Sequence, residues 1–342
     1  REMKATWKKL GATAVVEHGA NPGLVSHLVK KSMVDIATRA IKDGIANAGV
    51  EKALEADAYN ELAQHLGIKV IHIAERDTQV TDKPKQLNEF VNTWSVEGFY
   101  EEGIAPAELG WGTHEKLLPP NAYEHKTGPK NQILMAQPGA TTWVRSWVPN
   151  CETTGMVVRH GEAFTLSDHL TVWQGETAIY RPTVHYAYCP SNEAIVSMRE
   201  LEMRQWDLTP NQRIMNDEIT DGEDRLGVLL MGHAYKSWWT GSLLNIHDSR
   251  KLVPNQSATT VQVGSAVFAA VAWIMANPNK GLLVPDDMPW REVLPYAEKY
   301  WGGFHSEAAD WDPLQTRNDL YAGWNNRKYD TSDPWQFTNF LV

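Results

Sequence analysis

Residues 71–109 constrain the fold of this chain most, because two apolar runs there are separated by a proline-containing turn. Ile71 and Ile73 alternate with other residues and Glu75 follows in the same phase, which predicts the end of a half-buried β-strand. Residues 90–96 are rich in β-branched and aromatic side chains and predict a second strand. We expect the two strands to pair across the turn at Pro84.

That pairing would bring carboxylates and an indole into one pocket. Trp94 and Glu97 lie on or beside the second run, Glu101 and Glu102 follow it, and Glu75 ends the first. A carboxylate supplies charge and acceptor oxygens to an ammonium group, and an indole face adds about 0.5–2 kcal/mol when the cation is desolvated. The pattern predicts a pocket for a compact cation. The alternatives are a solvated acidic face and a tryptophan of the core.

Length and charge narrow the function classes. A chain of 342 residues exceeds the usual size of one compact domain and predicts two lobes. There are 32 Lys and Arg against 42 Asp and Glu, a net charge of −10 without a basic block. This balance argues against nucleic-acid binding and favours a cationic substrate. The two cysteines have no metal-binding spacing and indicate reduced thiols in a cytoplasm.

A helix start follows the first predicted strand, residues 13–17. Asn21 and Pro22 precede a strongly helical run, residues 24–45, and are expected at the N-cap and the first helical position. Free backbone N–H groups at such a terminus suit the phosphate or carboxamide of a cofactor. A capped helix without a ligand is the alternative.

The rest of the chain predicts mixed helices and strands without an internal repeat. The first ten residues are expected to end a helix, residues 108–112 to form a loop, and the segment from Trp301 onward to be a tail that docks by its aromatic side chains. The longest apolar run, residues 261–275, is too short to span a bilayer and predicts a core helix, not a membrane contact. Strands are expected at 133–136, 142–148, 155–158 and, as a hairpin, 226–231 and 238–244, and helices at 51–66, 192–203, 259–276 and 291–300.

Common catalytic motifs are missing from the sequence. The glycines at 110 and 112 lack the third glycine of a dinucleotide fingerprint, and neither a nucleophile elbow nor a zinc-protease motif occurs. His160 and His185 end predicted sheet elements, where catalytic groups often collect, although either one alone is more often a structural histidine.

Long motifs run through essentially the whole chain. They include HGANPGLVSHLVKKSMVDIA, IHIAERDTQ, FVNTWSVEGF, PAELGWGT, YRPTVHYAY, GVLLMGH and the terminal DTSDPWQFTNFLV. Together they closely resemble the bacterial homospermidine synthases, which belong to the wider saccharopine dehydrogenase-like group. The resemblance implies a cytoplasmic, homodimeric, NAD-dependent enzyme.

The resemblance also implies an α/β fold. A mixed-sheet substrate and dimerisation domain of α+β character, residues 21–258, is expected beside the remnant of a doubly wound Rossmann dinucleotide-binding domain, residues 1–20. Residues 259–342 are expected to form C-terminal helices and a tail packing back on the cofactor lobe. Most of the Rossmann domain of the family would precede Arg1.

Site residues carry over by motif. Asn21 resembles the asparagine between nicotinamide and substrate, and Glu75 and Glu102 resemble the carboxylates that hold putrescine amines, with Glu101 as the alternative to Glu102. Trp94 resembles the cation-binding indole, and His160 the histidine near the nicotinamide. Glu162 is expected at the pocket mouth. The expected cofactor contacts are Gly19, Ala20, Asn21, Pro22 and His160.

The implied reaction converts two putrescines into homospermidine and ammonia, with Glu75 or His160 as base and Asn21 as a third catalytic residue. Two rivals remain. A saccharopine or carboxynorspermidine dehydrogenase would bind amino-acid carboxylates and should present arginines in its pocket. A non-catalytic, polyamine-binding dimerisation lobe would have no cofactor chemistry.

Overall fold

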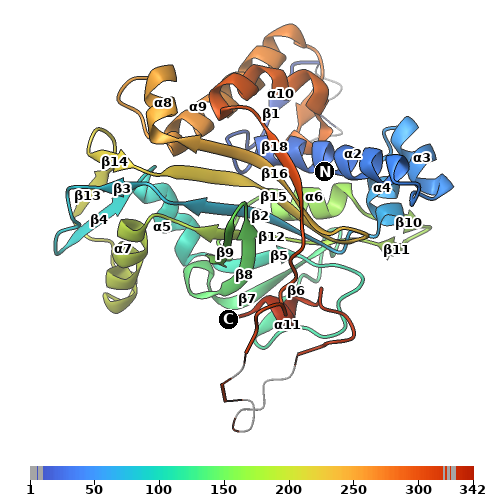
Figure 1. Cartoon of the computed structure of the whole chain (residues 1–342), viewed down its shortest axis with the longest axis horizontal. Coiled ribbons are helices and arrows are strands. Elements are labelled where there is room, and N and C mark those ends of the chain that lie inside the picture. The colour runs from blue at the N-terminus through green and yellow to red at the C-terminus, as the bar shows by residue number, and fades with distance from the viewer. Residues whose placement is uncertain (1–5, 7–10, 319, 322–323, 325–328) are drawn as a thin grey trace.

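The fold is built around a ten-stranded mixed β-sheet. The computed structural model describes residues 6, 11–318, 320–321, 324 and 329–342 (Figure 1). Most of the helix end expected in the first ten residues therefore lies outside the described part. The strand order is β18-β16-β15-β2-β12-β5-β7-β6, with β8 and β9 joined to the sheet through β12. The mixed α/β class predicted from the sequence is confirmed.

The elements have the following bounds. The large sheet contains β2 (Val70–Asp77), β5 (Pro106–Gly110), β6 (Ala122–Glu124), β7 (Gln132–Pro138), β8 (Trp143–Val148), β9 (Cys151–Met156), β12 (Thr183–Cys189), β15 (Glu223–His233), β16 (Lys236–Asn245) and β18 (His305–Ala309). Four strand pairs stand apart: β1 (Ala14–Val15) with β17 (Leu282–Leu283), β3 (Val80–Thr81) with β14 (Ile219–Asp221), β4 (Glu89–Asn92) with β13 (Asn211–Ile214), and β10 (Val172–Gln174) with β11 (Thr177–Tyr180). The α-helices are α2 (Leu24–Lys42), α3 (Ala48–Glu55), α4 (Tyr59–Leu66), α5 (Val96–Ile104), α6 (Glu162–His169), α7 (Asn192–Met203), α8 (Ile246–Leu252), α9 (Ala258–Ala276), α10 (Trp290–Glu298) and α11 (Phe337–Phe340).

Strand β2 lies at the centre of the sheet and is buried on both faces. It pairs with β12 in parallel and with β15 in antiparallel orientation. The expectation of a half-buried strand end at Glu75 is therefore wrong, since seven of its eight residues are buried. Because side chains alternate across a strand, Ile73 and Glu75 face one side of the sheet, while Ala74 packs in the cluster on the other side.

Helices cover the face that carries Glu75. Helix α2 packs on β15 and β16, α6 on β12 and β5, and α9 on β15 (Figure 1). The other face is covered by the β8–β9 hairpin and the C-terminal helix α11, whose Phe337 and Phe340 are fully buried. The two faces thus bury two separate apolar clusters.

The segment between Pro84 and Glu102 differs from its prediction. Strand β4 pairs with β13, and no pairing of β4 with β2 occurs. Trp94 follows β4 in a loop, and Ser95 begins helix α5 by accepting a hydrogen bond from the Gly98 N–H at 3.0 Å. Thr93 donates to Asp77 Oδ2 on β2 (2.6 Å). This contact, not a hairpin, brings Trp94 to the end of β2.

Three further expectations need correction. Helix α2 has Gly23 as its N-cap, and Asn21 is turned away from the helix because its amide bonds Glu75 and Tyr186. The helix expected over residues 51–66 is broken at Asp57, which adopts a φ of 49°. Residues 108–110 belong to strand β5 instead of a loop.

Other predictions are confirmed. Helix α7 has the predicted bounds, and β15 and β16 form the predicted hairpin. Helix α9 spans 19 residues, and an 18-residue stretch of it has a mean hydropathy of 1.6. By length and composition the helix could therefore cross a bilayer, which the shorter apolar run had not indicated. Half of the 18-residue stretch is buried inside the protein, where the Gln262 amide donates to the Asp224 carbonyl of β15. This burial agrees with the predicted core helix.

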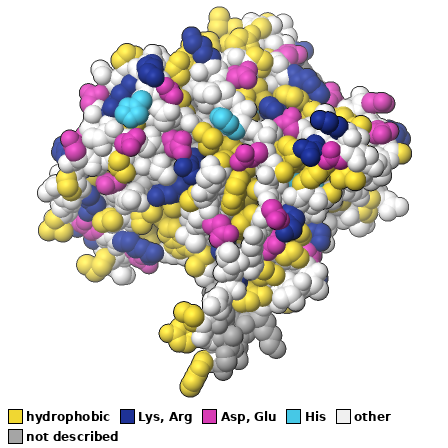
Figure 2. Space-filling view, viewed as in Figure 1, with side chains coloured by type: hydrophobic (Ala, Val, Ile, Leu, Met, Phe, Trp, Pro, Cys, Tyr) yellow, Lys and Arg dark blue, Asp and Glu magenta, His cyan; other side chains and the backbone are white. Residues whose placement is uncertain are grey.

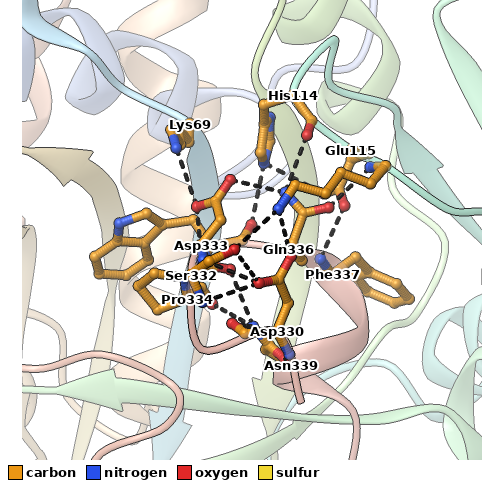
Figure 3. Close-up of polar contacts among 12 residues, drawn as sticks. Lys69, His114, Glu115, Asp330, Ser332, Asp333, Pro334, Gln336, Phe337 and Asn339 are labelled. Carbon is orange, nitrogen blue, oxygen red and sulfur yellow. Dashed lines mark hydrogen bonds and ion pairs between the residues drawn. The ribbon is translucent and has the colours of Figure 1, made fainter. Parts of the chain in front are cut away.

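The C-terminal segment docks on the sheet through a polar cluster (Figure 3). Asp333 pairs with Lys69 at 3.0 Å, and Gln336 donates to the His114 carbonyl at 2.9 Å. The backbone N–H of Phe337 donates to Glu115 Oε2 at 2.9 Å, which helps to seat the phenyl ring. The burial of Trp311, Phe337 and Phe340 agrees with the predicted aromatic docking of the tail, and the polar contacts add to it.

Candidate active site

A cavity of about 720 Å³ lies at the carboxyl end of β2, on the helix-covered face of the sheet. Such an end is a common ligand site in α/β folds, because connecting segments leave a crevice there. Five predicted catalytic and substrate-binding residues from distant parts of the chain line it: Asn21, Glu75, Trp94, Glu102 and His160. The other lining residues are Val16, Glu17, His18, Gly19, Ala20, Pro22, Glu101, Ala105, Arg159, Gly161, Phe164, Thr165, Tyr186, Thr259, Val263 and Val284.

Glu75 is almost fully buried at the base of this cavity, with 2% of its surface exposed. Its Oε2 accepts hydrogen bonds from Asn21 Nδ2 (3.0 Å) and from the Tyr186 hydroxyl. Burial raises the pKa of Glu75 to about 8, although these two donors and His160 act in the opposite direction. A carboxyl with such a pKa can take up and release a proton near neutral pH.

Two further carboxyls lie behind Glu75. Asp77 on β2 and Asp224 on β15 are directly opposite in the sheet and fully buried. Asp77 accepts bonds from Gln79 and Thr93, whereas Asp224 accepts one from Thr259 and keeps Oδ1 without a partner among the described residues. Burial and then repulsion by Glu75 and Asp77 raise the pKa of Asp224 well above its usual value.

His160 stands between two carboxylates. Its Nε2 lies 2.8 Å from Glu102 Oε2, and its Nδ1 lies 3.1 Å from Glu162 Oε1. Burial alone would lower the pKa of His160, but the two carboxylates outweigh it and raise that pKa well above 6.5. We therefore treat His160 as an imidazolium whose two N–H groups both donate.

An aromatic wall closes one side of the cavity. Trp94 Nε1 donates to the Tyr188 hydroxyl at 2.8 Å, which fixes the plane of the indole. The Tyr186 and Tyr188 rings stack at 5.1 Å with an interplanar angle of 12°, and the His160 ring lies 4.4 Å from Tyr186. Of the three Trp and Tyr rings, Trp94 and Tyr186 line the cavity, and the half-buried Trp94 indole is the candidate π-surface for a cation.

Some of the other predicted side chains line the cavity and some lie outside it. Glu101 and Glu102 both line the cavity, but only Glu102 is bonded to His160, whereas Glu101 is exposed. Glu162 is 1% exposed and lies behind His160, so it is not at the pocket mouth as expected. His185 lies outside the cavity, with its ring centroid 4.3 Å from that of His72 and the two rings tilted by 43°.

The turn before α2, Gly19 to Pro22, lines the cavity and is the candidate contact for the carboxamide of a cofactor. The cavity-lining backbone N–H groups of Ala20 and Asn21 make no hydrogen bond with any described residue, so both can donate to a ligand. A Cβ on Gly161 would lie 1.8 Å from Glu17 Oε2, so the Glu17 carboxylate would have to shift if a larger residue stood there. The expected cofactor contacts Gly19, Ala20, Asn21, Pro22 and His160 all line this cavity.

Several lining residues were not predicted. Tyr186 lies within the YRPTVHYAY motif, whose alternating tyrosines on a predicted sheet element were a usable signal. His18 lies within the turn motif and contacts the buried His27, with 3.1 Å between the two Nε2 atoms. Glu17 and Thr259 carry no local signal, because only the fold brings them to the cavity.

Comparison with known proteins gives consistent matches. A family profile described as Saccharopine dehydrogenase C-terminal domain matches residues 19–303. The chain is 44% identical over 339 residues to a homospermidine synthase of Mesorhizobium japonicum, covering 97% of this chain and 67% of that protein. It is 46% identical over 340 residues to a homospermidine synthase of Blastochloris viridis, with coverages of 97% and 68%. The crystal structure of the homospermidine synthase of Legionella pneumophila in complex with NAD is similar with a TM-score of 0.89 and 40% identity, over 97% of this chain and 70% of that one.

Proposed function

This chain belongs to the homospermidine synthase family and is an NAD-dependent enzyme, and we propose that its acidic, aromatic-lined cavity binds putrescine. In the proposed reaction two putrescines give homospermidine and ammonia without net oxidation. The roles of individual residues below are part of the proposal.

The charge of the cavity carries the proposal. Four glutamates line it, Glu17, Glu75, Glu101 and Glu102, against one arginine and the imidazolium of His160, which is already paired with Glu102 and Glu162. That arginine, Arg159, pairs with Glu108 at 2.8 Å. A diamine suits this lining, whereas the amino-acid carboxylate of a saccharopine or carboxynorspermidine dehydrogenase substrate would meet repulsion.

The two ends of the diamine have different tasks. One amine stays charged, and we assign it to the Trp94 face with Glu101 or Glu102 as its carboxylate partner. The amine on the reacting carbon has to be neutral before a hydride can leave that carbon. In water its pKa is near that of lysine, about 10.4. A base in the cavity must therefore take its proton.

Glu75 is the base in this proposal. The sequence left Glu75 and His160 as alternatives, but an imidazolium held by Glu102 and Glu162 has no free nitrogen to accept a proton. Glu75 Oε1 makes no hydrogen bond with any described residue and is accessible to solvent. Because Glu75 lines the cavity, this oxygen faces it. It can therefore receive the proton of the substrate ammonium.

NAD, when bound, accepts the hydride from the amine-bearing carbon and returns it at the end of the cycle. The protein holds the first, oxidised diamine while the amine of a second putrescine attacks the resulting imine and ammonia leaves. We propose that the turn from Gly19 to Pro22 holds the carboxamide end of the cofactor and that Asn21 lies between cofactor and substrate. The predicted catalytic set is thus Glu75, His160 and Asn21, with His160 acting as a fixed positive charge.

Product analysis of the full-length protein tests this function. Putrescine and NAD should give homospermidine and ammonia in equal amounts, with no accumulation of NADH. NADH accumulating without homospermidine would instead indicate a plain amine dehydrogenase. A requirement for an amino-acid semialdehyde would indicate the rival reductases.

Replacing Trp94 by Leu should raise the KM for putrescine by about 2- to 30-fold, as expected for loss of a cation–π contact of about 0.5–2 kcal/mol. Fold and NAD content should stay unchanged, because Trp94 is half-buried in a loop. Trp173→Leu on β10, outside the cavity, is the matched control. Unchanged steady-state kinetics in Trp94→Leu would refute the cation–π contact.

Two further expectations are retained as proposals. We infer a homodimer and a cytoplasmic location from the family resemblance, and we assign no residue to the dimer interface. On the face drawn in Figure 2, basic and acidic side chains are interspersed, and the basic ones form no continuous stripe. Light scattering of the purified protein gives its mass and tests the dimer.

A further inference from the structure

Tyr186 was not among the predicted site residues, yet it joins two of them. Its hydroxyl accepts a hydrogen bond from Asn21 Nδ2 at 2.6 Å and donates to Glu75 Oε2. The same Asn21 amide nitrogen also lies 3.0 Å from Glu75 Oε2, so it shares its hydrogen bond between the two oxygens. The three side chains therefore form a closed triangle of hydrogen bonds.

The Tyr186 ring is rigidly held. It is 3% exposed, stacks on Tyr188 and contacts the His160 ring. Strand β12 runs parallel to β2, with Tyr186 opposite Ile73 and Tyr188 opposite Glu75. The position of the hydroxyl is thus set by the central pair of strands and not by a loop.

The hydrogen bonds of the triangle occupy some polar atoms and leave others free to bind the substrate amine. Glu75 Oε2, the Tyr186 hydroxyl and the Asn21 amide nitrogen all bond inside it. Glu75 Oε1 and Asn21 Oδ1 have no partner among the described residues and are accessible to solvent, so two acceptor atoms face the cavity. A reacting amine needs acceptors of this kind for its N–H groups.

We propose that Tyr186 is a positioning residue for this reaction: its hydroxyl fixes Glu75 and Asn21 so that Oε1 and Oδ1 receive the reacting amine, and it keeps Glu75 ionisable. This inference rests on the proposed function of Glu75 as base. A donor that is itself polarised by Asn21 stabilises the carboxylate form of Glu75 more strongly than an isolated hydroxyl would.

The electrostatic surroundings make that donor necessary. Glu75 is buried near other acidic groups, and burial raises its pKa first, while the bond from Tyr186 is the foremost influence that lowers it. The titratable groups around Glu75 and Tyr186 are Asp77 on β2, Asp224 on β15, Tyr188 on β12, Glu102 on α5 and His160 before α6. Without the hydroxyl, Glu75 should hold its proton to higher pH and act as a base only there.

The test is the pH profile of Tyr186→Phe in the full-length enzyme with NAD and putrescine. The acid limb of kcat/KM, which reports ionisation of Glu75, should move upward by about 1–2 pH units, the equivalent of one hydrogen bond to a charged group. At pH 7.5 the rate should fall by about 10- to 100-fold, and it should recover in part at alkaline pH. A merely structural loss would lower the rate equally at all pH values.

Tyr180→Phe is the matched control, since the Tyr180 hydroxyl donates to the Ile68 carbonyl (2.7 Å) outside the cavity. This control variant should keep the acid limb of the kcat/KM profile at the wild-type pH. The proposal would be overturned by a Tyr186→Phe variant that is folded, binds NAD and shows the acid limb of kcat/KM at the same pH as the wild type. If the wild-type protein makes no homospermidine, the proposed function itself fails, so the two failures are distinguishable.

Discussion

Replacing Glu75 by Gln should lower kcat/KM for putrescine by about 10²–10⁴-fold, the usual contribution of a general base. The amide cannot accept a proton, but its oxygen can still accept the bonds from Asn21 and Tyr186, so the site should keep its shape. Because the pKa of Glu75 is raised to about 8, wild-type activity should rise with pH through that region. The variant should lack this rise.

Steady-state rates of both proteins between pH 6 and pH 10 check this expectation. Glu61→Gln, an exposed position on α4, is the control and should match the wild type. A wild-type acid limb near pH 8 that survives in Glu75→Gln would assign the titration to another group and remove Glu75 as base.

Replacing His160 by Gln should destabilise the protein by about 3–5 kcal/mol, as for a buried ion pair that loses one partner. Glu162 would then be left buried without its cation, and Glu102 would lose its bond to Nε2. The partial exposure of Glu102, 28% of its side chain, favours the lower part of this range.

The pH dependence of this effect has a definite sign. The folded-state pKa of His160 is raised above 6.5 by Glu102 and Glu162 against the effect of burial. Its stabilising contribution is therefore complete below pH 6.5 and is lost as the pH rises through the raised pKa. Urea unfolding of the wild type and His160→Gln at pH 6 and at alkaline pH should show a difference that shrinks with pH.

A second replacement isolates the charge effect. In His160→Gln with Glu162→Gln, the buried uncompensated carboxylate is removed as well, so part of the lost stability should return. A double variant less stable than the single one would mean that packing, and not charge, accounts for the role of His160.

Strong local signals predicted much of the fold. Helix α7 and the β15–β16 hairpin were predicted because periodicity and breakers agree over long stretches. The strand predicted over residues 90–96 ends at Asn92, and α5 begins at Val96. The prediction ran too far because a short apolar run suits either a buried strand or the start of a helix. Ser95 as N-cap was the available signal for α5.

The candidate site was predicted more successfully than its geometry. Motif resemblance selected Glu75, Trp94 and His160, and all three line one cavity, although no hairpin unites them. The Tyr186–Glu75 contact joins residues 111 positions apart through parallel strand pairing, which no local pattern encodes. The contacts of His160 with Glu102 on α5 and Glu162 on α6 likewise join distant parts of the chain, and they are the reason that we propose Glu75 as the base.

The most direct measurement is a crystal structure of the full-length protein with NAD and putrescine. We expect one amine nitrogen at hydrogen-bond distance from Glu75 Oε1, about 2.7–3.2 Å. The other should lie within about 6 Å of the Trp94 ring centroid, beside Glu101 or Glu102. Putrescine bound outside this cavity, or with neither nitrogen in reach of Glu75, would contradict the account.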